Sequence, residues 1–271
     1  MSMSIRTQTM AACRASFGTL ALACTGAALL LSTATAFGQS ASGTRPDFSG
    51  IWRAANAANW DLEPHAAEPG PVPSLGALLA VPPGPGVVVG GAIPYLPAAL
   101  ERRKQNRDQR WTADPEIKCF MPGVPRANYL PYPFQIVQGT DAIIMTYEFA
   151  DAVRTVYLKD PGPAPANSWM GWNVGRWDGN TLVVDVTAQH DDTWLDRSGN
   201  YHSDEVHVVE RYTLRSPDVL DYEATIEDPK VFSRPWTIRM PLYRDASENA
   251  RLMEFKCIPF AEPALYDNVG R

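Results

Sequence analysis

Cysteine, histidine and long apolar runs are all scarce in this sequence. Its 4 cysteines form no zinc-ligand pattern such as C-x-x-C, and its 4 histidines form no H-x-H or HExxH pair. A P-loop, a dinucleotide-binding glycine fingerprint, a G-x-S-x-G nucleophile elbow and an S-x-x-K motif are also missing. No run beyond residue 31 is long and apolar enough to span a bilayer. We therefore expect no metal, no cofactor and no membrane span in the mature chain.

The start of the chain is typical of a secretory signal peptide. Arg6 and Arg14 precede an apolar segment of about 15 residues, and an A-x-A pattern ends at Ala36. We predict a signal peptide over residues 1–38, cleaved near Ala36, and a periplasmic or secreted protein. A membrane anchor is disfavoured because the apolar run is short. A lipoprotein anchored at Cys24 is disfavoured because the apolar run continues beyond that cysteine.

Acidic residues outnumber basic residues by 30 to 24, which gives a formal net charge of −6. Cleavage removes two arginines and no acid, so 22 basic residues remain and the net charge becomes −8. An acidic surface repels phosphate groups, and we expect no nucleic acid partner. Residues 39–46 are polar and are predicted to be a disordered linker. Residues 47–271 are long enough for one domain with a substantial core.

Two cysteines, Cys119 and Cys257, remain after the predicted cleavage. Two lone cysteines in an oxidising compartment more often pair than stay free. The bridge would close a loop of about 140 residues, worth on the order of 4–5 kcal/mol in the chain-entropy model. We predict one structural disulfide.

Strand signals dominate the second half of the chain. Apolar and aromatic segments are separated by turn sequences such as Asp178-Gly179-Asn180. Alternate residues from Val206 to Leu214 share one face, and Glu210 lies on it. The predicted strands are 48–52, 142–149, 152–158, 170–177, 181–187, 205–215, 219–227, 235–244 and 250–257. This pattern predicts a mainly β fold, an antiparallel meander of about 8–10 strands that closes into a barrel or packs as two sheets to remove its edges.

Two proline- and glycine-rich segments, 56–97 and 115–134, interrupt this pattern. Loops of this length in a compact domain are functional cover or disorder, and we predict that they cover one end of the barrel. The polar segment 98–110 is predicted to be one short surface helix.

Histidines and carboxylates supply the candidate acid–base residues. Three histidines lie between residues 190 and 207, among aspartates, and a histidine oriented by a carboxylate can act as a general base. The simplest alternative is a solvated loop with surface histidines. If the protein is an enzyme, we expect catalytic roles for His65, His202, Asp204 and Glu227.

Aromatic residues supply the candidate ligand-binding surface. Tyrosines in the 115–134 segment could present phenols to a pocket, although they could equally form a hydrophobic plug. Tryptophans in the strand region could line a cavity, although filling the core is the simpler role. The predicted ligand-binding residues are Tyr129, Tyr132, Trp172, Trp194, His207 and Trp236.

Residues 171–187, which read GWNVGRWDGNTLVVDVT, resemble a family of largely uncharacterised exported bacterial proteins. Further matching stretches are 47–52, 119–126, 131–138, 203–212 and 222–236. The resemblance implies a lipocalin-like (calycin) barrel, which agrees with the meander. It implies no catalytic residues, because most members of the family have no assigned activity.

Together these observations favour a small-molecule-binding barrel for an apolar or aromatic ligand. A cofactor-free lyase, hydratase or isomerase is the first alternative, with a histidine base and a tyrosine donor. A structural envelope protein with a filled barrel is the second, because fold alone does not decide function.

Overall fold

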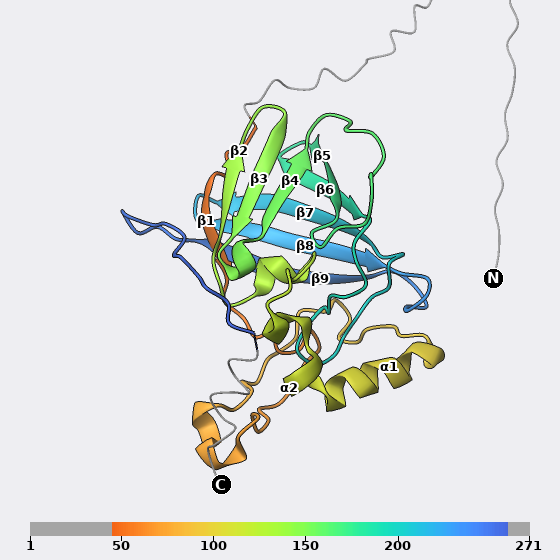
Figure 1. The fold of residues 1–271 in the computed structure, drawn as a ribbon. Helices are drawn as coiled ribbons and strands as arrows, with labels where there is room; N and C mark the ends of the chain where they lie inside the picture. Colours follow the sequence, from red (N-terminus) through yellow and green to blue (C-terminus); the bar gives the residue numbers. More distant parts are fainter. Residues whose placement is uncertain (1–44, 260–271) are drawn as a thin grey trace, which may run out of the picture. The chain divides into compact units, whose positions relative to one another are not determined.

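A computed structural model describes residues 45–259 of the protein. The predicted signal peptide lies outside these residues, as does most of the predicted linker. The described residues form a closed barrel of nine strands, in which each strand pairs with the next along the chain and the last pairs with the first (Figure 1). No helix between residues 45 and 259 has the length and apolarity needed to cross a membrane.

The strands follow the order of the chain around the barrel. They are β1 (Gly50–Ala54), β2 (Phe134–Gln138), β3 (Ala142–Tyr147), β4 (Val153–Tyr157), β5 (Trp172–Asp178), β6 (Thr181–Thr187), β7 (His207–Ser216), β8 (Val219–Glu227) and β9 (Trp236–Arg244).

A tight turn and the alternation of buried and exposed side chains explain the antiparallel strands β5 to β8. Asp178 of β5 pairs with Thr181 of β6 across a two-residue turn, in which Gly179 adopts a left-handed φ of 57°. The inward residues of β7 and β8 are buried, except for the partly buried Leu214, and they pair directly across the two strands. These features confirm the predicted mainly β barrel and the predicted alternation of β7.

Three details of the strand prediction are wrong. Strands β4 and β5 pair in parallel, because the long loop between them carries the chain back along the barrel wall. Residues 250–257 form no strand. Strand β2 instead closes the sheet beside β1, and the prediction missed it because it directly follows a proline-dense segment.

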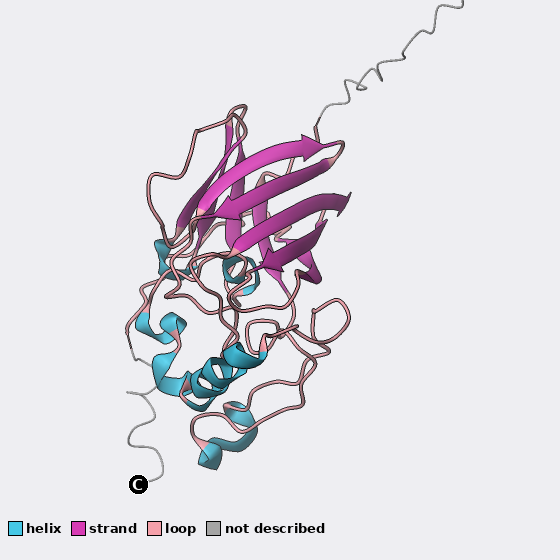
Figure 2. Cartoon of the chain, turned by 90° about the vertical axis from the view of Figure 1, so that its right-hand side faces the viewer, coloured by secondary structure: helices cyan, strands magenta, loops and turns pink. Residues whose placement is uncertain are grey.

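Helices and loops gather at one end of the barrel (Figures 1 and 2). The predicted surface helix is present as α1 (Pro97–Asp108), followed by the short α2 (Arg110–Ala113). The 3-10 helices are η1 (Pro73–Leu78), η2 (Pro115–Lys118), η3 (Arg126–Tyr129) and η4 (Phe149–Asp151).

Part of the 56–97 segment completes the sheet where β1 is too short to do so. Strand β1 pairs with only the last part of β9, from Leu242 to Arg244. Val87 and Val89 exchange backbone hydrogen bonds with Arg239 and Thr237, at 2.9 and 2.8 Å. The chain therefore covers this strand edge with its own loop, which is how proteins protect unpaired edges.

The outer face of the barrel is divided by charge. Outward side chains of β2, β3 and β4 carry no charge. Cross-strand ion pairs lie on the outer face from β5 to β9 and join Arg176 to Asp185, Arg211 to Asp178, Arg215 to Asp221 and Arg239 to Glu223. Such exposed pairs contribute little to stability. The side of the barrel formed by β2, β3 and β4 carries no charged side chain on its outer face.

Candidate functional site

A cleft of about 380 Å³ opens at the seam between β4 and β5. Residues of β4 line one side of the cleft, and the long loop from β4 to β5 lines the other. In Figure 1 this loop runs beside the barrel. Tyr157, Trp169 and Trp172 provide its aromatic side chains, whereas Arg154 and Asn173 lie where the two strands part.

The seam opens because β4 and β5 meet over a short stretch. Their register contains two residue pairs, which join Val156 to Asn173 and Tyr157 to Val174. Gly175 lets the strands approach at this point, since a Cβ there would lie 2.6 Å from Cγ1 of Val156. The chain turns at Gly171, with a φ of 68°, immediately before β5 begins.

Arg154 and Asn173 hold the parted strands together. The Nε of Arg154 donates to Oδ1 of Asn173 at 2.7 Å. The amide of Asn173 donates to the carbonyls of Met170 and Gly171, at 3.1 and 3.0 Å. These side-chain bonds replace backbone pairing where the ladder is interrupted.

A polar network that includes Arg154 fills the centre of the barrel. Arg154 forms an ion pair with Glu210 of β7, and neither side chain is exposed. Tyr212, Tyr222 and Asn128 donate to Oε1 of Glu210 at 2.9, 2.7 and 2.8 Å. Burial opposes the charged form of Arg154, but the Glu210 carboxylate raises the pKa of Arg154 well above its usual value.

The tyrosines of this network act as hydrogen-bond donors. Burial and the Glu210 carboxylate raise the pKa of Tyr212 and of Tyr222 well above the usual value, so both phenols stay protonated. Tyr147 donates to Oδ1 of Asn128 at 2.9 Å. The barrel centre is therefore occupied by hydrogen-bonded side chains, and the β4–β5 cleft lies at the wall.

Aromatic rings continue around the cleft. The ring of Trp169 lies 5.0 Å from that of Phe120 and 5.2 Å from that of His190. Trp172 packs against Tyr157 at 4.9 Å, and its Nε1 donates to the carbonyl of Gly162 at 3.0 Å. Such rings offer flat apolar surfaces for a ligand.

The predicted catalytic histidines are bonded to their own surroundings. His202 is 1 % exposed; its Nδ1 contacts the carbonyl of Ser203 at 2.8 Å and its Nε2 contacts the hydroxyl of Thr193 at 2.7 Å. Burial lowers the pKa of His202, which favours the neutral ring. The ring of His65 lies between the carbonyls of Glu63 and Pro82. Neither histidine lines the cleft.

The predicted carboxylates and His207 lie elsewhere. Asp204 is exposed and forms an ion pair of 3.0 Å with Lys230, whose hydrogen bond lowers the pKa of Asp204. Glu227 ends β8 and is exposed. His207 begins β7 on the outer face, 3.3 Å from Asp185. No hydrogen bond or ion pair within residues 45–259 joins these groups to His65 or His202.

Of the predicted ligand-binding aromatics, Trp172 lines the cleft. Tyr129 is buried, and its hydroxyl donates to the carbonyl of Leu195 at 2.7 Å. Trp194 is buried, and it pairs with Tyr201 through a β-bridge. Trp236 packs inside the barrel against Phe232, and within the described part of the chain its Nε1 has no acceptor.

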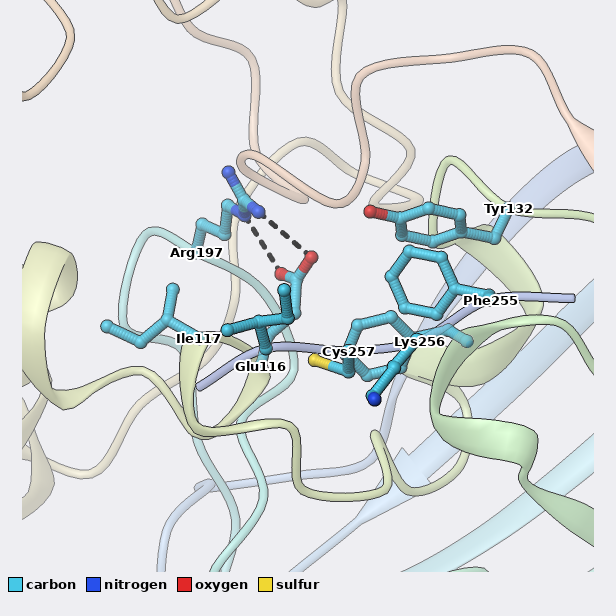
Figure 3. Close-up of a pocket in the computed structure, with 9 residues that line it drawn as sticks. Glu116, Ile117, Tyr132, Arg197, Phe255, Lys256 and Cys257 are labelled. Carbon is cyan, nitrogen blue, oxygen red and sulfur yellow. Dashed lines mark hydrogen bonds and ion pairs between the residues drawn. The ribbon is translucent and has the colours of Figure 1, made fainter. Parts of the chain in front are cut away.

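Tyr132 lines a second cavity of about 220 Å³ (Figure 3). Its ring packs against Phe149 and Phe255, at 5.4 and 4.7 Å. On the other side, Arg197 donates two hydrogen bonds to the Glu116 carboxylate, at 2.8 and 2.9 Å. Burial opposes the charged carboxylate, but Arg197 and Arg126 lower the pKa of Glu116.

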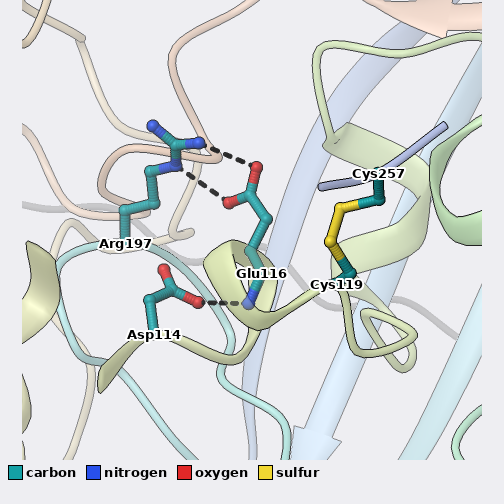
Figure 4. Close-up of a disulfide and its surroundings, with 5 residues drawn as sticks. All are labelled: Asp114, Glu116, Cys119, Arg197 and Cys257. Atoms are coloured by element: carbon teal, nitrogen blue, oxygen red, sulfur yellow. Dashed lines mark hydrogen bonds and ion pairs between the residues drawn. A yellow bond between two sulfur atoms is a disulfide. The ribbon is translucent and has the colours of Figure 1, made fainter. Parts of the chain in front are cut away.

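The predicted disulfide between Cys119 and Cys257 is present (Figure 4). It attaches the C-terminal segment beside η2 and the Glu116–Arg197 ion pair. Arg126, buried near this point, binds both oxygens of Asp114 at 2.8 and 2.9 Å. The disulfide therefore holds the C-terminal segment, which lines the second cavity, beside these buried ion pairs.

A buried carboxylate with an unusual pKa lies in the loop after β6. Burial and the nearby Asp61 carboxylate raise the pKa of Asp196 to about 7. Ser198 donates to Asp61 at 2.7 Å and Arg107 also contacts Ser198. The cavity beside this cluster measures about 10 Å³, which is too small for a substrate.

Sequence reasoning missed Arg154 and Asn173, and it counted Trp169 among the tryptophans that could line a cavity without selecting it. Glu210 gave a signal, because a glutamate on an otherwise apolar strand face requires a buried partner. Its partner lies 56 residues away, and no local pattern identifies it. Within residues 45–259, no three His, Cys, Asp or Glu side chains are grouped to hold a metal ion.

No protein-family model and no curated protein matches the chain. The closed nine-stranded barrel is compatible with a calycin-like fold. Membership in the exported bacterial family stays a prediction.

Proposed function

We propose that the protein binds a small, uncharged, apolar or aromatic molecule in the β4–β5 cleft. The observation that carries this proposal is a cleft of about 380 Å³ with three aromatic side chains in its lining. Arg154 is the one charged residue among those that line it, and Glu210 neutralises that charge. A charged ligand would therefore have no partner there, whereas an uncharged aromatic one would bury apolar surface.

The same proposal places the protein outside the cytoplasm, in the periplasm or the medium. The disulfide supports this location, because such bonds persist in oxidising compartments. Detecting the mature N-terminus near residue 37 by mass spectrometry of the secreted protein would test it.

Binding is favoured over acid–base catalysis by the composition of the cleft. General acid–base catalysis needs a group that can exchange a proton within hydrogen-bond reach of the substrate. Tyr157 lines the cleft, but no histidine, aspartate or glutamate is among the lining residues to act with it as a base. The predicted catalytic residues His65, His202, Asp204 and Glu227 lie outside it.

The test is a titration with N-phenyl-1-naphthylamine, an uncharged aromatic probe whose fluorescence rises in apolar sites. We expect saturable binding to the wild-type protein, weakened about tenfold or more by Trp169→Ala, since burying one aromatic side chain is worth a few kcal/mol. Trp111→Ala is the matched control, because Trp111 lies on α2 and not in the cleft.

A second variant shows which of the two cavities binds the probe. Phe255→Ala removes one wall of the 220 Å³ cavity and leaves the β4–β5 cleft intact. Probe binding that is lost in Phe255→Ala and kept in Trp169→Ala would overturn the proposed site.

A further inference from the structure

One edge of β4 lacks a backbone partner next to the cleft. On one side, all five residues of β4 pair with β3, from Val153 opposite Thr146 to Tyr157 opposite Ala142. On the other side, the register with β5 includes Val156 and Tyr157. Among residues 45–259, no residue of the segment 153–155 has a register partner in a strand other than β3.

The loop that could pair with this edge is bonded elsewhere. Ser168 exchanges backbone hydrogen bonds with Ala188 and His190, at 2.9 and 3.1 Å, beyond the end of β6. The amide of Asn173 binds the next carbonyls along the loop. The loop is thereby held away from β4, and the cleft is the space between them.

The corresponding gap beside β9 is closed. There, Val87 and Val89 of the 56–97 segment bond to the β9 backbone where β1 does not reach. The chain thus covers one interrupted seam with its own backbone and leaves the other open. An open strand edge offers N–H and C=O groups to an added strand.

We propose that the β4–β5 cleft receives a short extended peptide, which adds to β4 along residues 153–155. The inference rests on the proposed function and names the chemistry of its ligand. Alternate residues of a strand direct their backbone groups to the same side, so this edge offers about two hydrogen bonds. Three residues of strand span roughly 10 Å, which suits a peptide of two or three residues.

Side chains of the cleft define which peptide fits. Trp169 and Trp172 would contact apolar or aromatic side chains of the added segment. The Arg154 charge is satisfied by Glu210, and the outward side chains of β2–β4 are uncharged. The ligand is therefore an uncharged peptide with at least one aromatic side chain.

Two probes test this, a dipeptide of valine and phenylalanine capped by N-acetyl and C-amide groups, and the same compound with both residue nitrogens methylated. Methylation keeps the side chains and removes the N–H groups that pair with a strand edge. We expect the unmethylated peptide to bind at least about tenfold more tightly, measured by calorimetry, since methylation removes the one residue N–H that faces the edge and leaves its acceptor on β4 unsatisfied. Its binding should shift the ¹⁵N–¹H signals of residues 153–155.

The naphthylamine probe separates the two proposals. If it binds and neither peptide does, the inference is wrong and the small-molecule site stands. Equal affinity of the two peptides, or shifts that avoid residues 153–155, would also overturn strand addition. If no probe binds, both proposals fail. Val137→Ala, on the outer face of β2, is the control that should leave peptide affinity unchanged.

Discussion

Arg154 of β4 and Glu210 of β7 form an ion pair inside the barrel, and both side chains are fully shielded from solvent. Strand β4 lies on one side of the cleft, and β7 follows β5 and β6 on the other side. The ion pair joins β4 to β7 through the centre of the barrel. Glu210 also accepts hydrogen bonds from two tyrosines and Asn128, so its lone pairs are well satisfied. A buried ion pair is stable only when such additional bonds offset its desolvation.

Removing one charge of this pair should be strongly destabilising. Glu210→Gln leaves the Arg154 guanidinium charged and without its counter-ion in the barrel centre. We expect the free energy of unfolding to fall by about 3–5 kcal/mol, measured by urea denaturation. The matched control is Glu223→Gln, which breaks an exposed pair with Arg239 and should cost about 1 kcal/mol or less. Similar losses for both variants would contradict the structural role of Glu210.

The disulfide supports a second stability prediction. Replacing Cys119 and Cys257 by serine removes a cross-link between residues 138 positions apart. In the chain-entropy model this costs on the order of 4–5 kcal/mol, because the unfolded chain regains the freedom of a long loop. The measurement is thermal unfolding with and without a reductant. The wild type should lose stability on reduction, and the double variant should not respond to the reductant.

The fold was more predictable than the site. The Asp178-Gly179-Asn180 turn and the alternation in β7 are local signals, and both correspond to structure. The parallel pairing of β4 with β5 was not predictable, since it depends on where the loop ends at Gly171 and on the space at Gly175. Propensity alone does not encode such long-range geometry.

The candidate site was harder to predict for a related reason. Trp172 was identified from its place in a strand, whereas Trp169 lies in the loop before it and Arg154 gives no local sign of burial. The histidines were predicted as catalytic because of their chemistry, but both ring nitrogens of His202 form hydrogen bonds to neighbouring residues in the core. The residues with acid–base chemistry in the sequence therefore did not indicate where the β4–β5 cleft lies.

Burial of His202 predicts a pH dependence of stability. Its folded-state pKa is lowered by burial, so the unfolded chain binds a proton more readily as the pH falls through about 6.5. The stabilising contribution of the neutral ring is present above pH 6.5 and is lost below it, with a slope of up to about 1.4 kcal/mol per pH unit. His202→Gln is neutral at every pH and should flatten the urea-unfolding profile between pH 7 and pH 5. An unchanged slope in this variant would contradict the prediction.

Asn173 links the stability of the seam to ligand binding. Asn173→Ala removes the acceptor for Nε of Arg154 and both donors that hold the carbonyls of Met170 and Gly171. Leaving a buried guanidinium N–H without a partner should lower the free energy of unfolding by about 1–3 kcal/mol. We also expect faster amide hydrogen exchange at residues 168–171 and weaker binding of the naphthylamine probe, because the loop is no longer held at the cleft. Asp160→Ala is the matched control, since Asp160 is exposed on the same loop and does not line the cleft. If both variants lose stability and probe affinity equally, the loop as a whole, and not the Asn173 bridge, shapes the cleft.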